Sequence, residues 1–332
     1  MAKKKVKKSL KSITNTHKGK LLGPKSLKPQ QTRQIIRRFH IIQKNKYSII
    51  SKLRKANSNI DINDYDSIKN SKVYQNEFKN FKIPTKYSEN EIYKIDNTST
   101  DKELIKILAR IDSEIEQRGG LKTYQSASTQ GQTSKRGGDS SKKLIEWLKT
   151  SKYETKLTQD LNALEIGCLS PHNIISTSKI FKSITRIDLN SQDPFILQQD
   201  FMERSLPTSE EEKFNLISCS LVLNFVPSHE KRGEMLIRIT KYLKSPKNGQ
   251  LSSLFLVLPL PCVKNSRYFD NDKLLEIMGK LGFKQTFFYE ANKVAYWLFD
   301  WNGKVSKNIT FNKKELHSGS TRNNFCISID NT

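Results

Sequence analysis

Short apolar runs alternate with amphipathic segments through the second half of the chain. Most of the runs end near glycine, asparagine, proline or an acid, which is typical of buried parallel strands. Between the runs, apolar residues recur three or four positions apart, which indicates helices. We expect strands at residues 163–166, 185–190, 196–200, 214–220, 253–258, 283–289 and 294–301, an edge strand at 325–329, and helices at 174–181, 228–243 and 272–281. This order predicts an α/β fold with a doubly wound sheet and helices on both faces.

The first half of the chain has a different pattern. Helical spacing of apolar residues predicts helices over residues 32–55, 101–118 and 141–150. Residues 57–100 are rich in Asn, Asp, Ser and Lys and are predicted to form loops with short helical turns, whereas residues 121–141 are predicted to form one long polar loop. We therefore divide the chain into a disordered basic tail (1–30), a helical region (31–120) and an α/β domain (121–330).

The net charge of +25 is concentrated near the N-terminus. The first 60 residues hold 18 of the 58 Lys and Arg and no acid, so the remainder of the chain carries only +7 (25 − 18). A basic arm on a nearly balanced domain is typical of a protein that binds a polyanion, with nucleic acid as the first candidate. The lysine-rich start also resembles a localisation signal for the nucleus or nucleolus, although a solubilising tail has the same composition. The basic helix at 32–55 can lie on RNA, lie on a membrane surface or pack on the domain.

The cysteines indicate neither a metal site nor a disulfide framework. They are Cys168, Cys219, Cys262 and Cys326, and none forms a Cys or His pair with the spacing of a zinc site. We interpret them as reduced thiols of an intracellular protein. The N-terminal lysines are followed by no apolar segment and no apolar run reaches 18 residues, so neither a secretory signal nor a membrane span is expected. A monomer is expected.

Gly167 ends the first expected strand, and Asp188 ends the second strand 21 residues later. A glycine at such a turn lets the backbone approach a ligand closely, because no Cβ intervenes. In doubly wound folds, an acid about 20 residues after the glycine turn accepts hydrogen bonds from ribose hydroxyls. The turn holds a single glycine, whereas the dinucleotide fingerprint needs several to accommodate a pyrophosphate. The pattern therefore favours a ligand with a ribose and no phosphate, such as S-adenosylmethionine (SAM).

Further candidate site residues follow the next two strands. We expect Asp200 to meet the adenine amino group of SAM and Phe201 to pack on the adenine face. After the fourth strand, Ser220 is placed to touch the cofactor, and Asn224 and Phe225 are placed to hold a target base by hydrogen bonding and stacking. In the simpler alternative, Asp188 and Asp200 are ordinary strand-end acids on solvated loops, and Phe225 is a packing residue. Leu221 and Leu223 are expected to be packing residues.

The polar loop at 121–141 precedes the first strand and contains Arg136. Loops of this length inside a compact domain are commonly functional. The loop can fold over the cofactor so that Arg136 meets the methionine carboxylate, or it can be a plain flexible linker. The helix that follows it is expected to cover the edge of the first strand.

Several of these segments together resemble the family of 25S ribosomal RNA adenine-N1 methyltransferases. The segments that carry the resemblance are RGGDSSK at 136–142, LIEWL at 144–148, LEIG at 164–167, RIDLN at 186–190, QDFM at 199–202, SLVLNFVP at 220–227 and YWLF at 296–299. The resemblance covers roughly residues 101–330. It implies the Rossmann-like sheet of class I SAM-dependent methyltransferases, with Gly167 and Asp188 at the cofactor and Asp200, Phe201 and Ser220 as weaker carry-overs.

The resemblance also implies a substrate, ribosomal RNA or a pre-ribosomal particle, and a role in ribosome biogenesis in the nucleolus. Adenine N1 carries a free lone pair, so methyl transfer needs positioning rather than a general base, and no catalytic residue is nominated. Because N1 lies on the Watson–Crick edge, the target must be single-stranded or flipped. A SAM sensor that controls a protein partner has the same glycine turn and acid, but it does not require the basic tail. The tail also disfavours a methyltransferase for small molecules.

Overall fold

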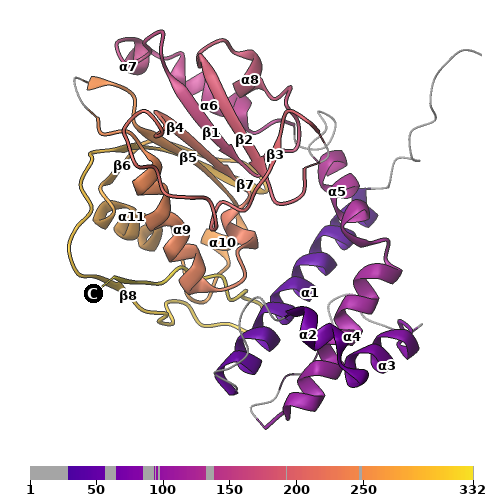
Figure 1. Ribbon diagram of the computed structural model, residues 1–332. Helices are drawn as coiled ribbons and strands as arrows, with labels where there is room; N and C mark the ends of the chain where they lie inside the picture. Colours follow the sequence, from indigo (N-terminus) through magenta and orange to yellow (C-terminus); the bar gives the residue numbers. More distant parts are fainter. Residues whose placement is uncertain are drawn as a thin grey trace, which may run out of the picture.

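A computed structural model describes residues 29–56, 65–84, 93, 95, 98–131, 138–191, 193–246 and 249–331 (Figure 1). The N-terminal helices are α1 (Pro29–Ala56), α2 (Tyr65–Asn70), α3 (Lys72–Asn80), α4 (Asp101–Gln117) and α5 (Gly120–Gly131). The later helices are α6 (Ser141–Leu148), α7 (Ser151–Glu154), α8 (Ile174–Thr177), α9 (His229–Tyr242), α10 (Pro261–Lys264) and α11 (Asn271–Lys280), with a 3-10 turn, η2, at Leu223–Phe225. The strands are β1 (Asn162–Ile166), β2 (Ser183–Asp188), β3 (Leu197–Gln198), β4 (Leu216–Ser220), β5 (Ser253–Pro259), β6 (Phe283–Glu290), β7 (Val294–Trp301), β8 (Ile309–Phe311) and β9 (Ile329–Asn331).

Seven of the strands form one sheet in the order β3-β2-β1-β4-β5-β7-β6. The first five strands in this order are parallel, and β7 runs antiparallel to both of its neighbours. The register places Ile166 of β1 between Ile187 of β2 and Cys219 of β4, so the ends of these strands lie side by side. The predicted doubly wound sheet is confirmed, and β7 is its reversed strand.

Helices cover both faces of the sheet, as the sequence predicted (Figure 1). One face packs on α9 and α11 through a core that includes Leu236, Ile239 and Leu274. The other face packs on α6, whose Leu144 and Leu148 are completely buried. The expectation that α6 covers the edge of β1 was wrong, because its apolar side chains share a cluster with residues of β1, β4, β5 and β7.

Two expected elements near the sheet differ from the structure. The helix expected at 174–181 stops at Thr177, and Lys179 has a left-handed backbone with φ of 61°. The edge strand expected at 325–329 does not extend the large sheet; β9 pairs with β8 in a separate two-stranded sheet. The segment before β9 packs instead on α9, where a Cβ on Gly233 would lie 1.9 Å from the carbonyl oxygen of Ser328.

The N-terminal helices build a third hydrophobic cluster beside the sheet (Figure 1). Its buried residues come from α1, α2, α3 and α4: Ile42, Ile49, Leu53, Ile68, Tyr74, Leu104, Leu108, Ala109 and Ile111. Residues 57–100, expected to be mainly loops, include α2 and α3, and α3 is nine residues long. The division of the chain at residue 120 stays a prediction.

Helix α5 occupies much of the segment that was predicted to be a loop at 121–141. Its residues are mostly Gly, Ser, Thr and Gln, which are weak helix formers or neutral, so local propensity gave no signal. Packing supplies the missing stabilisation: Ala127 is completely buried, and the ring of Tyr124 stacks on Phe39 of α1 at a centroid distance of 4.2 Å. The prediction of a loop was therefore wrong for residues 121–131, while Arg136 lies outside the described residues.

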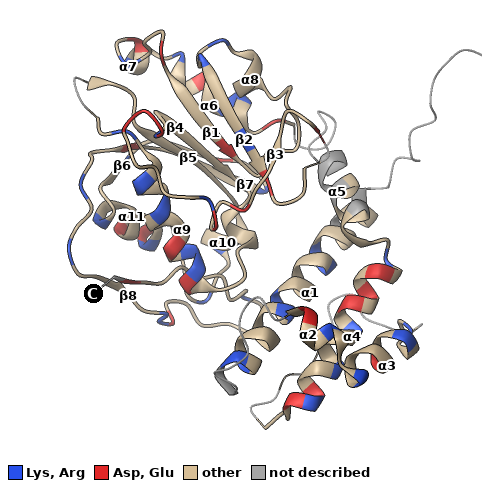
Figure 2. Ribbon diagram, in the orientation of Figure 1, with Lys and Arg blue, Asp and Glu red and all other residues tan. Residues whose placement is uncertain are grey.

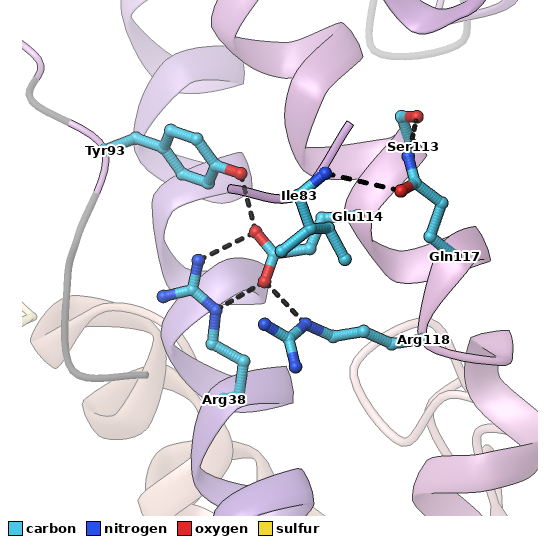
Figure 3. Close-up of polar contacts among 7 residues, drawn as sticks. All are labelled: Arg38, Ile83, Tyr93, Ser113, Glu114, Gln117 and Arg118. Atoms are coloured by element: carbon cyan, nitrogen blue, oxygen red, sulfur yellow. Dashed lines mark hydrogen bonds and ion pairs between the residues drawn. The ribbon is translucent and has the colours of Figure 1, made fainter. Parts of the chain in front are cut away.

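Helix α1 packs on α4 through complementary charge. Helix α1 contains no acid, whereas α4 carries five, and Figure 2 shows the acids along α4. Arg38 donates from Nε and Nη2 to the two carboxylate oxygens of Glu114, each at 2.7 Å, and both side chains are buried (Figure 3). Lys46 bonds Asp112 at 2.8 Å. The basic helix is thus packed on the protein, and two of its other charged side chains, Arg37 and Lys44, are exposed.

Candidate functional site

The site begins at the turn after β1, where strand order reverses between β1 and β4. Doubly wound folds bind ligands at this point, beyond the carboxyl ends of the strands. Gly167 has φ of +74°, and its amide donates to the carbonyl of Ile187 at 2.8 Å, which places the turn directly beside Asp188. A Cβ on Gly167 would lie 2.4 Å from Cγ2 of Val222 in the segment after β4. The turn after β1 and the segment after β4 therefore meet at Gly167.

Asp188 ends β2 and is partly buried. Its Oδ1 accepts the amide of Asn190 at 2.9 Å. Burial raises the pKa of this carboxyl above its ordinary value, and the bond from Asn190 offsets only part of that effect. The charged form of a partly buried carboxylate is stabilised when a ligand donates hydrogen bonds from its hydroxyl groups.

Glu165 is a candidate site residue that the sequence reasoning missed. It is 7% exposed on β1, two residues before the glycine turn. Its Oε1 accepts Nδ2 of Asn173 at 2.7 Å, whereas Oε2 has no hydrogen-bond partner among the described residues. Burial raises the pKa of this carboxyl. An acid within an otherwise apolar strand was the available signal, because such a residue is seldom buried without a partner.

The described part of the motif, residues 138–142, ties the start of α8 to the end of β4. Oδ1 of Asp139 accepts the amide and the hydroxyl of Ser141, and its other oxygen accepts the amide of Ile174 at the start of α8. The hydroxyl of Ser140 lies 2.7 Å from that of Ser220, at the end of β4. Ser220 therefore contacts Ser140 of this motif, and its contact with the cofactor stays a prediction.

Asp200 and Phe201 follow β3. Oδ1 of Asp200 accepts the amide of Met202 at 2.7 Å, which shapes the turn. Phe201 is 3% exposed, and its ring lies 5.2 Å from the ring of Tyr242 in the core beneath α9. The ring thus packs in the core, and its stacking on the adenine of SAM stays a prediction.

Asn224 and Phe225 lie in the 3-10 turn that follows β4. Phe225 is 40% exposed, whereas Leu223 beside it is completely buried, as expected for a packing residue. Oδ1 of Asn224 is buried and without a hydrogen-bond partner in the part of the chain that the structure describes. An exposed ring next to an unsatisfied acceptor suits a base-binding position.

The ring of His40, from α1, stacks on Phe225 with a centroid distance of 3.5 Å and an interplanar angle of 11°. Nε2 of His40 lies 3.1 Å from the hydroxyl of Tyr124 on α5. Burial lowers the pKa of His40 to about 3, so the imidazole is neutral at physiological pH. The sequence reasoning missed His40, because its partner lies far away in the chain.

Comparison with known proteins identifies a family for the part of the chain that holds the sheet. Residues 109–327 match the family described as 25S rRNA (adenine(2142)-N(1))-methyltransferase, Bmt2. The chain belongs to this family. A relative named 25S rRNA (adenine(2142)-N(1))-methyltransferase, from Saccharomyces cerevisiae, is 36% identical over 347 residues, which cover 97% of this chain and 99% of the relative. A relative named 25S rRNA adenine-N(1) methyltransferase, from Schizosaccharomyces pombe, is 44% identical over 67% of this chain and 82% of its own length.

Among solved structures, a S-adenosylmethionine dependent methyltransferase from Mesorhizobium loti is 10% identical, covers 48% of this chain and 97% of its own, and has a TM-score of 0.36. The family match begins within α4 and includes Glu165, Gly167, Asp188 and Phe225. His40 lies before the family match, although the similarity to the Saccharomyces cerevisiae relative extends over nearly the whole chain.

Two further properties concern the described residues only. In these ranges, His, Cys, Asp and Glu side chains do not gather in groups of three or more that could hold a metal ion. The helices that the structure describes include none long and apolar enough to cross a membrane.

Proposed function

We propose that the chain is a SAM-dependent methyltransferase that methylates N1 of an adenine in large-subunit ribosomal RNA. The observation that carries this proposal is the family match, which spans the sheet and the candidate site. Both curated relatives are named for methylation of adenine N1 in 25S rRNA, and one name gives position 2142. The corresponding adenine is the proposed target.

The residues at the switch point fit SAM. Gly167 gives the turn the left-handed backbone that places it beside Asp188, and Asp188 offers a carboxylate to the ribose hydroxyls. The unpartnered oxygen of Glu165 offers an acceptor beneath the turn for the ammonium group of the methionine part. When bound, SAM supplies an electrophilic methyl group on a sulfonium. Arg136 stays a predicted contact for the methionine carboxylate.

The chain's own task is to orient the adenine and exclude water. The N1 lone pair forms the new bond to the methyl carbon, and the electrons of the breaking bond return to sulfur, so a base is not required. Phe225 provides a stacking surface, and Asn224 provides an acceptor for the adenine amino group. The methylated base is cationic, and the face of an aromatic ring favours a cation.

The basic sequence before Asp61 supports an RNA partner and a place in the nucleolus. We therefore assign the chain to ribosome biogenesis as a monomer that acts on ribosomal RNA or on a pre-ribosomal particle. A tagged chain should concentrate in the nucleolus, and deletion of residues 1–30 should disperse it. Retention of the truncated chain in the nucleolus would mean that the tail is not the signal.

The function is tested by methyl transfer from labelled SAM. The substrates are large-subunit RNA and pre-ribosomal particles taken from cells that lack the protein, and the RNA is digested to identify the modified nucleoside. We expect label in 1-methyladenosine with the wild-type chain and none with Asp188→Ala. Normal methylation by Asp188→Ala would overturn the site assignment. SAM binding without transfer to either substrate would favour a SAM sensor.

A further inference from the structure

We propose that α1 forms part of the target-base site, and that His40 is a positioning residue that holds Phe225 as the surface on which the adenine stacks. The inference rests on the proposed function and adds a residue from outside the sheet. One ring face of Phe225 is covered by His40 at 3.5 Å, and 40% of the side chain remains exposed. The covered face fixes the ring, and the exposed part is available to the base.

The position of Phe225 beside the glycine turn supports this role. Its amide donates to the carbonyl of Val222 at 2.8 Å, and Val222 packs against Gly167. The same turn carries Asn224 with its unsatisfied Oδ1. An acceptor at this place suits the amino group of adenine and disfavours guanine, which presents a carbonyl at the equivalent position.

Contacts on several sides hold His40 itself. The hydroxyl of Tyr124 bonds its Nε2, and the Tyr124 ring stacks on the neighbouring Phe39 with an interplanar angle of 14°. Arg38 lies two positions before His40, on a different face of α1, and its buried pair with Glu114 fixes the helix against α4. Helix α5 thus contacts the imidazole directly, and α4 fixes the helix that carries it.

The neutral state of His40 suits the reaction. As the methyl group transfers, positive charge develops on the adenine, and the electron-rich face of Phe225 attracts it. A protonated imidazole stacked behind the same ring would add a like charge and oppose this attraction. Burial of His40 between α1, α5 and the 3-10 turn keeps the imidazole uncharged at physiological pH.

The test compares three single variants by steady-state methylation of large-subunit RNA. His40→Ala removes the ring that holds Phe225 and should lower kcat about tenfold, because the adenine would then stack on a ring that is no longer fixed in position. His40→Phe keeps the stack and should stay within about threefold of wild type. Phe78→Ala is the matched control, because it removes a stack on Tyr74 elsewhere in the N-terminal helices. SAM affinity, measured by calorimetry, should be unchanged in all three.

A double-mutant cycle tests whether His40 acts through Phe225. If it does, His40→Ala combined with Phe225→Ala should lose no more activity than Phe225→Ala alone. Additive losses would overturn the proposal, as would a wild-type rate for His40→Ala. A faster rate for His40→Ala would also overturn it, because the imidazole would then occupy the place of the base. Failure of the wild-type chain to methylate RNA would instead overturn the proposed function, and this inference with it.

Discussion

Gly167 and Val222 approach so closely that a single added methyl group would not fit between them. A Cβ on Gly167 would lie 2.4 Å from Cγ2 of Val222, and the backbone of Gly167 is left-handed with φ of +74°. Two separate physical reasons therefore require glycine here: backbone conformation and space. The contact also joins the turn after β1 to the segment that carries Phe225.

Gly167→Ala should weaken SAM binding at least about tenfold, because the left-handed backbone alone costs an L-residue roughly 1–2 kcal/mol. Val222→Ala added to Gly167→Ala should restore part of the affinity by removing the clash. Gly249→Ala is the control, because Gly249 has φ of +72° and open space around its Cβ position. Calorimetric titration measures the SAM affinity of all three variants. An equal loss of affinity in Gly167→Ala and in the double variant would show that the space beside Val222 does not limit binding.

Asp188→Asn should weaken SAM binding about 100-fold, because two hydrogen bonds to a charged carboxylate become bonds to an amide. In the wild type, affinity should fall as the pH drops through the raised pKa of Asp188. The raised pKa also means that the ionised carboxylate lowers native stability at neutral pH, so Asp188→Asn should melt at an equal or higher temperature.

The control for Asp188→Asn is Asp160→Asn, an exposed carboxylate before β1 that pairs with Lys182 at 2.6 Å. Its SAM affinity should equal that of the wild type at every pH. Binding by Asp188→Asn that matches the wild type would contradict the assignment of Asp188 to the ribose.

The sheet and its glycine turn could be predicted because their signals are local. Strand ends, the lone glycine and the acid 21 residues later are read from neighbouring residues, and parallel strands bring their ends together. The pairing of β9 with β8 could not be predicted in this way. The strand with which β9 pairs depends on where the chain crosses α9, and no local pattern in the sequence specifies that position.

The contribution of α1 and α5 to the site could not be predicted, because it depends on contacts between distant segments. His40 and Phe225 are separated by most of the chain, and the residue types of α5 favour a loop unless α1 is packed against it. For Phe201, a local signal was present, but it did not reveal the packing of the side chain. Its place after β3 suggested a ligand contact, but only the packed structure shows its ring against Tyr242.

Arg38→Met should lower the free energy of unfolding by about 3 kcal/mol or more, because it leaves the buried Glu114 carboxylate without its bidentate partner. Burial alone would raise the pKa of Glu114, but bonds from Arg38, Tyr93 and Arg118 outweigh it and lower the pKa. Arg110→Met is the control, because its pair with Glu77 is partly exposed and should contribute less than about 1 kcal/mol. Denaturant unfolding measures both, and equal effects would refute the importance of the buried pair.

Acid should destabilise the chain through His40. Its pKa is about 3 in the folded state, against an ordinary value of 6.5. Between these values the unfolded chain binds a proton that the folded chain excludes, so stability is undiminished above pH 6.5 and falls as the pH drops towards 3. At pH 5 this loss should reach about 2 kcal/mol.

His40→Phe should remove the acid-induced loss of stability that His40 causes. The stability of this variant should therefore fall less steeply than that of the wild type between pH 7 and pH 5. Burial also lowers the pKa of His229, so the difference between the two proteins, rather than either curve alone, isolates His40. His172→Phe changes an exposed histidine and serves as the matched substitution control. Denaturant unfolding across this pH range measures the slopes. Parallel curves for wild type and His40→Phe would mean that the imidazole is not held neutral by its burial between α1 and the 3-10 turn.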